Sequence, residues 1–93
     1  MFHENNKLIR KEEKEKQIRK YLNYDEQLNA LDLILWQTDN YFGDVDGRTE
    51  QEKNLLGFLE REIHNLQYTV ECLKSEFEYN RFDVENERNK EED

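Results

Sequence analysis

The apolar positions in the second half of the chain follow a heptad. They recur at alternating intervals of three and four residues, and the rhythm continues through Asn80 to Val84. β-branched residues recur at one heptad position and leucine at the other, which favours the packing of two helices. The pattern predicts a long amphipathic helix over residues 49–88, followed by an acidic tail at 89–93. The residues that define it are Leu56, Leu59, Ile63, Leu66, Val70, Leu73 and Phe77.

The first half carries a similar but shorter stripe. Upstream of Ile18 the pattern fails, because Lys14 and Gln17 occupy the positions where apolar residues are expected. The run 10–20 is nevertheless rich in strong helix formers. We therefore predict a helix over residues 5–38. Its stripe consists of Tyr21, Tyr24, Leu28, Leu31 and Leu35.

A segment rich in Asp, Asn and Gly separates the two predicted helices. We expect a loop at residues 39–48, with Asp and Gly supplying positive φ angles in a tight turn. Thr49 and Glu52 form a T-x-x-E capping box, which marks the start of the second helix. The segment is a poor calcium loop, because aligning Gly47 with the sixth position places Lys53 where a bidentate Glu is needed.

Two helices and one short loop define an all-α fold, a single antiparallel two-helix hairpin. Folding at the loop is expected to place Leu35 opposite Leu56, Leu28 opposite Ile63 and Tyr21 opposite Val70. In this register Leu59 is covered within the hairpin. Leu73 and Phe77 face only Ile18, Gln17 and Lys14, and Phe82 and Val84 face Leu8 and Ile9 at best.

The incomplete cover and small core favour association with itself or with another helical protein. Trp36, near the end of the first helix, either plugs the hairpin end or anchors a partner, and the two roles are compatible. The predicted partner-binding residues are Trp36, Val70, Leu73, Phe77, Phe82 and Val84.

Composition narrows the function classes. The chain has 93 residues, of which 40% are charged, and its net charge of −9 disfavours nucleic acid as a partner. No run of 18 apolar residues exists, so no membrane span is expected. The small apolar content argues against an enzyme with an enclosed pocket.

Candidate chemistry is sparse. His64 and Cys72 are eight residues apart on one predicted helix, too far for a catalytic pair, and no third or fourth ligand is near for zinc. We therefore predict no catalytic residues, no metal site and no cofactor. The single cysteine excludes an internal disulfide. The cytoplasm is the expected location, and any export would use a leaderless route because no apolar signal-peptide segment is present.

A long helix ending near Trp36, a Gly-containing turn and a second long helix resemble the small helical-hairpin proteins of type VII secretion systems. That family carries a W-x-G turn and a C-terminal Y-x-x-x-D/E export signal, which Tyr79 and Asp83 match. Trp36 is followed by Gln37 and Thr38, and the nearest glycine is Gly43. The chain is therefore closer in character to the accessory hairpins that pair with the helical N-terminal domain of LXG-type toxins.

The resemblance implies a targeting factor or chaperone for a toxin exported by type VII secretion. Its partner would be the helical domain of the toxin, a second small hairpin, or both. The heptad pattern by itself implies only docking. The alternative is a self-associating coiled-coil protein with a regulatory or structural role, which includes a phage-derived one.

Overall fold

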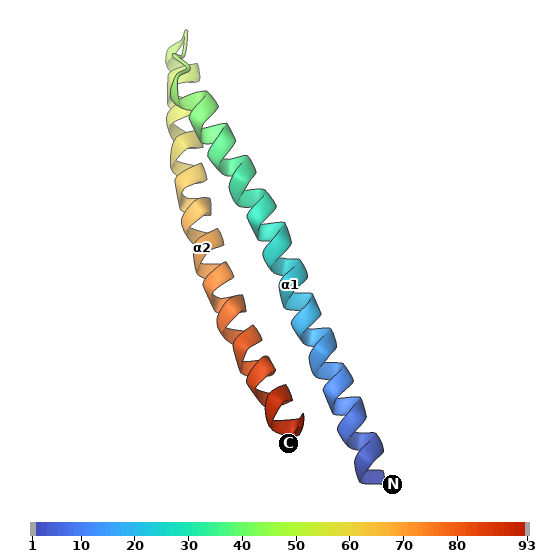
Figure 1. The fold of residues 1–93 in the computed structure, drawn as a ribbon. Coiled ribbons are helices and arrows are strands. Elements are labelled where there is room, and N and C mark those ends of the chain that lie inside the picture. The colour runs from blue at the N-terminus through green and yellow to red at the C-terminus, as the bar shows by residue number, and fades with distance from the viewer. Residues whose placement is uncertain (1, 93) are drawn as a thin grey trace. The chain divides into compact units, whose positions relative to one another are not determined.

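The computed structural model describes residues 2–92, and the side chains of residues 10–90. It consists of two helices, α1 (Phe2–Gly43) and α2 (Glu50–Glu92), with no strand among the described residues (Figure 1). The two helices pack against each other in an antiparallel arrangement. The predicted all-α helical hairpin is therefore confirmed.

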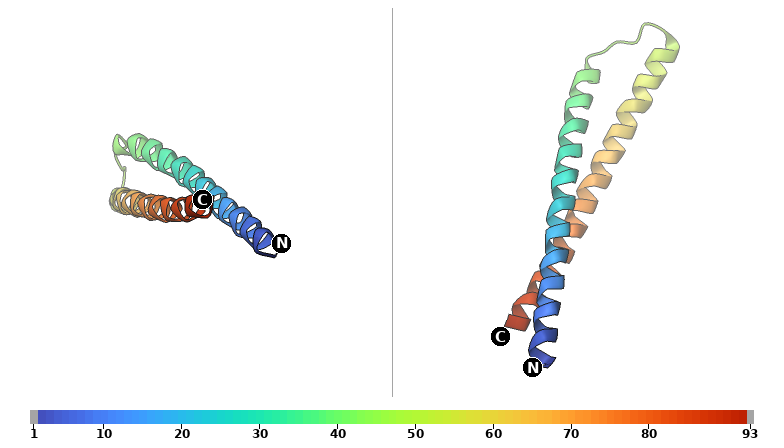
Figure 2. Two further views of the ribbon diagram at one scale, coloured as in Figure 1. Left: turned by 60° about the horizontal axis from the view of Figure 1, so that its bottom comes forward. Right: turned by 90° about the vertical axis from the view of Figure 1, so that its right-hand side faces the viewer.

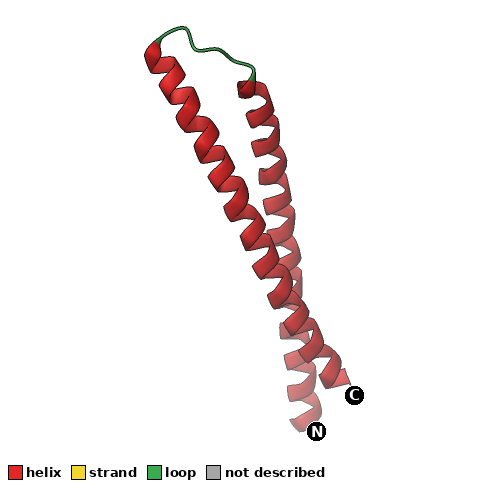
Figure 3. Cartoon of the chain, turned by 90° about the vertical axis from the view of Figure 1, so that its left-hand side faces the viewer, coloured by secondary structure: helices red, strands yellow, loops and turns green. Residues whose placement is uncertain are grey.

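The first helix continues beyond its predicted end at residue 38. Asp39 to Gly43 add a further turn, and the connection is correspondingly short, as the green segment in Figure 3 shows. A tertiary contact stabilises this turn, because Asp39 Oδ2 lies 3.2 Å from His64 Nε2 of α2. The turn residues Asp39 and Asn40 have weak helix propensity, and tertiary contacts routinely override so small a preference.

The capping box predicted from the sequence is present. The backbone N–H of Glu52 donates to Thr49 Oγ1 at 3.1 Å, and the backbone N–H of Thr49 donates to Glu52 Oε2 at 3.3 Å. Each side chain thus satisfies a backbone donor of the other residue, which fixes the start of α2.

The expectation of positive φ angles in the loop is wrong, because no described residue has one. Gly47 is needed for a different reason. A Cβ atom built at Gly47 would lie 2.6 Å from the backbone nitrogen of Lys53, which no side chain can tolerate. The loop therefore requires glycine because it passes close to the first turn of α2.

The chain divides into two units. The loop unit comprises Leu28–Leu73, and the terminal unit comprises the described residues up to Gln27 and from Lys74 onward. In the loop unit the core is aliphatic: Leu35, Ile63 and Val70 are buried, with Leu28 and Leu31 packed against them.

The helices of the terminal unit meet through rings and charged side chains. The ring centroid of Phe77 lies 5.9 Å from that of Tyr21 and 5.2 Å from that of Tyr24. Ile18 is the buried apolar residue of this unit. Farther from the rings, Lys14 Nζ lies 3.9 Å from Glu87 Oε2.

The register differs from the predicted one in both units. Phe77 contacts Tyr21 and Tyr24, so the expectation that it faces only Ile18, Gln17 and Lys14 is wrong. In the loop unit, α2 begins beyond the end of α1, as the yellow and green segments of Figure 2 show. The loop therefore joins helix ends at different levels, which a symmetric fold about the loop does not anticipate.

Candidate docking surfaces

The contact between the helices uses only part of the apolar stripe on α2. Ile63 and Val70 point into the core as predicted. The leucines at the other heptad position remain accessible: Leu59, Leu66 and Leu73 are 36%, 42% and 40% exposed. The expectation that Leu59 is covered within the hairpin is therefore wrong. α1 packs on the opposite flank of the buried residues, where Gln67 is partly buried.

Two of the exposed leucines, Leu59 and Leu66, line a groove between the helices of the loop unit, with a volume of about 480 Å³. Helical spacing extends this surface to Leu31 and Ile34 on α1 and to Leu55 and Leu73 on α2. Glu62 is the only charged residue among those that line the groove. We call this surface the leucine face, and its groove is lined by Leu35, Thr38, Leu59, Glu62, Ile63, Asn65, Leu66 and Thr69.

A second hollow lies on another side of the loop unit, with a volume of about 670 Å³. Three large side chains around it are mostly exposed: Leu33 at 55%, Trp36 at 59% and Tyr68 at 71%. Two carboxylates, Asp32 and Glu71, also line it. We call this surface the tryptophan face, and it consists of Asn29, Asp32, Leu33, Trp36, His64, Gln67, Tyr68 and Glu71.

Tyr68 and Cys72 are one turn apart on α2, and this proximity affects the titration of Tyr68. The hydrogen bond to Cys72 and the charge of its thiolate raise the pKa of the Tyr68 hydroxyl above its ordinary value. Cys72 is an exposed free thiol. The Tyr68 ring itself stays accessible, so this bond does not remove it from the tryptophan face.

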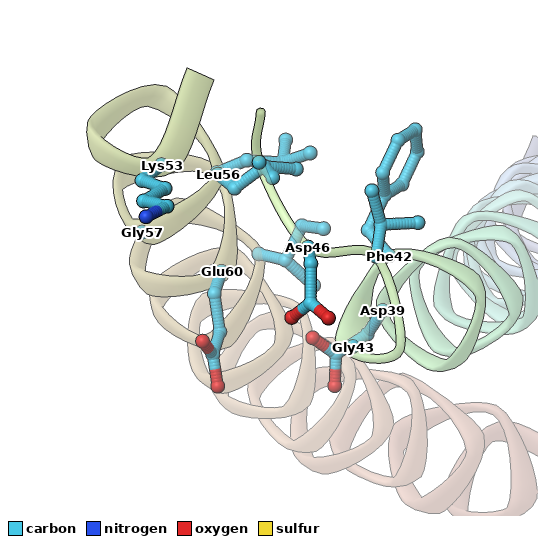
Figure 4. Close-up of a pocket in the computed structure, with 12 residues that line it drawn as sticks. Asp39, Phe42, Gly43, Asp46, Lys53, Leu56, Gly57 and Glu60 are labelled. Carbon is cyan, nitrogen blue, oxygen red and sulfur yellow. The ribbon is translucent and has the colours of Figure 1, made fainter. Parts of the chain in front are cut away.

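A third hollow of about 340 Å³ lies beneath the loop. Figure 4 shows the carboxylates of Asp39 and Asp46 pointing toward each other. Glu60 projects from α2 on another side of the hollow. The described residues contain no group of three His, Cys, Asp or Glu side chains arranged to hold a metal ion. The hollow is open and acidic, and it brings together no recognisable catalytic set.

The predicted partner-binding residues fall into different environments. Trp36 and Leu73 are accessible, on the tryptophan and leucine faces respectively, whereas Val70 is only 2% exposed and supports the leucine face from beneath. Phe82 is exposed, and Phe77 and Val84 are partly buried. The side chains of Leu8 and Ile9, predicted to cover Phe82 and Val84, lie outside the described part.

The predicted export residues are both accessible. Tyr79 is 71% exposed and Asp83 is exposed one turn later on α2. Residues four positions apart share one side of a helix, so a partner could contact both together.

Sequence reasoning missed the leucine face, although the heptad pattern includes its leucines. The heptad placed Leu59 and Leu66 in the contact between the helices together with Ile63 and Val70. Periodicity identifies an apolar stripe, but the stripe does not specify which of its flanks the partner helix covers. The charge-poor segment 54–59 was the available signal. Its apolar residues occupy more than one side of the helix, and a single packed helix covers only one side.

No protein-family model, curated protein or solved structure matches this chain. Within residues 2–92, neither helix has a stretch long and apolar enough to cross a membrane. The functional argument therefore depends on the surfaces themselves.

Proposed function

We propose that this chain is a helical binding module that docks on another helical protein through its tryptophan face. The observation that carries the proposal is the grouping of Leu33, Trp36 and Tyr68, all mostly exposed, around one hollow. Large aromatic side chains dominate the energetics of protein interfaces. Exposing three large side chains at one place has no role in stabilising the hairpin.

The charges around the hollow favour a particular kind of partner. Asp32 and Glu71 line the tryptophan face, and the whole chain carries a net charge of −9. An amphipathic helix with an apolar stripe and flanking Lys or Arg residues complements this surface, because opposite charges accelerate encounter and fix orientation.

The resemblance to type VII hairpins supports a more specific proposal. The partner is the helical domain of an LXG-type toxin, and this chain serves as its targeting factor or chaperone. The exposed pair Tyr79 and Asp83 is the export signal, in which the ring supplies apolar area and the carboxylate fixes orientation. Binding takes place in the cytoplasm and involves no catalysis and no cofactor.

The test uses the helical N-terminal domain of an LXG-type toxin. The purified domain and chain should form a complex, and Trp36→Ala should weaken it by about thirtyfold, corresponding to about 2 kcal/mol, as titration calorimetry would measure. Tyr41→Ala is the matched control, because Tyr41 is an exposed aromatic residue outside the hollow. Equal affinity of the two variants would refute docking through the tryptophan face.

The export arm uses the double variant Tyr79→Ala with Asp83→Ala. If the pair is the signal, secretion of the toxin falls to background while complex formation and helicity stay unchanged. Normal secretion would show that the pair is ordinary surface. Loss of the complex itself would instead place the pair in the docking interface.

A self-associating coiled-coil protein is the second candidate function. The leucine face favours it, because its exposed leucines need a cover. Docking at the tryptophan face does not supply that cover, since that face lies on a different side of the loop unit.

A further inference from the structure

The leucine face is poor in charge within a chain that is rich in it. Charged residues make up 40% of the sequence, yet Glu62 is the only one among the eight that line the groove. Its remaining polar residues, Thr38, Asn65 and Thr69, are uncharged. A solvated helix face normally carries the charges, so this composition is that of a surface covered by protein.

The exposed area is also larger than that of a compact monomer of the same mass. The chain exposes 7888 Å². A folded monomer of its size exposes about 5,800 Å², so the excess is roughly 2,000 Å². A stable interface removes a total of about 1,200–2,000 Å² from solvent, half of it from each partner. The excess summed over the whole chain is larger than the share that one copy contributes to such an interface.

The spacing of the leucines fits a second copy of this chain. Leu59, Leu66 and Leu73 are seven residues apart, so a two-fold axis through Leu66 places the stripe on its own copy. Leu66 then meets Leu66, and Leu59 meets Leu73. Two-fold interfaces of this kind are self-complementary and closed. We propose that the occupant of the leucine face is a second copy of this chain, forming a four-helix dimer of loop units.

Electrostatics permits this pairing despite the acidity of the chain. Two copies with a net charge of −9 repel each other, and they can approach most closely where charges are fewest. With the axis at Leu66, Glu62 is opposite position 70 of the copy. The two Glu62 positions are then separated by eight residues, about 12 Å along the helix, which is beyond the screening length of about 8 Å at physiological salt.

The inference rests on the second candidate function, self-association, and gives it a geometry. It is independent of docking through the tryptophan face, which stays accessible on both copies. Sedimentation equilibrium of the full chain should give twice the monomer mass. Leu66→Glu should raise the dimer dissociation constant roughly a hundredfold or more, because it places a carboxylate at the centre of an apolar interface. Tyr68→Glu introduces the same charge on the tryptophan face and should leave the dimer unchanged, as should Trp36→Ala.

A second variant keeps the test decisive if Leu66→Glu impairs folding. Leu66→Cys in a Cys72→Ser background should form a covalent dimer on mild oxidation, whereas Tyr68→Cys in the same background should not. A monomer at high concentration, a larger assembly, or equal crosslinking at both positions would overturn the proposal. A dimer that Leu66→Glu dissociates but Leu66→Cys fails to crosslink would overturn the two-fold axis at Leu66.

Discussion

The loop unit and the terminal unit are built from the same two helices. They differ in the side chains through which the two helices contact each other. The loop unit buries Leu35, Ile63 and Val70. The terminal unit joins its helices through the rings of Tyr21, Tyr24 and Phe77 and through the ion pair between Lys14 and Glu87, with Ile18 as a buried apolar residue. Two helices of the same chain thus use an aliphatic core at one place and a mixed interface at another.

The mixed interface of the terminal unit contributes less to stability per residue than the aliphatic core of the loop unit does. Arg81 Nε and Arg88 Nε are buried without a hydrogen-bond partner, and Arg81 Nε lies 3.6 Å from Glu85 Oε1, an ion-pair distance too long for a hydrogen bond. Burying a polar donor without a partner costs free energy, whereas burying an aliphatic side chain contributes it. We therefore expect the loop unit to dominate the stability of the hairpin.

The largest effect is expected from a charge in the aliphatic core. Val70→Asp should lower the free energy of unfolding by about 4 kcal/mol or more, because the carboxylate would be buried without a partner. Urea unfolding followed by circular dichroism measures this change. Asn54→Asp, at an exposed position of α2, is the control and should change stability by about 0.5 kcal/mol at most. A folded Val70→Asp variant of near wild-type stability would break the comparison.

A smaller effect is expected from the aromatic contact of the terminal unit. Phe77→Ala should cost about 2 kcal/mol, below the usual range for a fully buried ring because Phe77 is only partly buried. Hydrogen exchange should show lost protection after residue 74 while the amides of Ile63 to Val70 remain protected. The exposed Phe58 provides the control variant, Phe58→Ala. Uniform loss of protection along α2 would mean that the two units unfold together.

The smallest effect is expected from the ion pair between Lys14 and Glu87. Glu87→Gln should cost about 0.5 kcal/mol or less, because Glu87 is more than half exposed and water screens the pair. Glu78→Gln removes the same charge from an exposed position without this partner. The difference between the two variants should vanish in 1 M salt, and a difference that persists there would indicate a contact of another kind.

Much of the architecture was predictable because it depends on local features. The heptad and the T-x-x-E box at Thr49 and Glu52 act within a few residues, so they identify α2 and its first turn. The end of α1 was not predictable in this way, since the final turn is held by the contact between Asp39 and His64. Of the candidate surfaces, Trp36 and Leu73 were named from the sequence, whereas Leu59 and Leu66 were assigned to the interior.

What the sequence determined by itself is the number of helices, their amphipathic character and the place where the chain reverses. These properties follow from periodicity, helix propensity and capping, all of which act over a turn or two of chain. Only the tertiary structure decided the register between the helices and which flank of the α2 stripe α1 covers. Both choices depend on the combined packing of side chains distant in sequence, and a stripe of Leu, Ile and Val offers nearly equal burial on either flank.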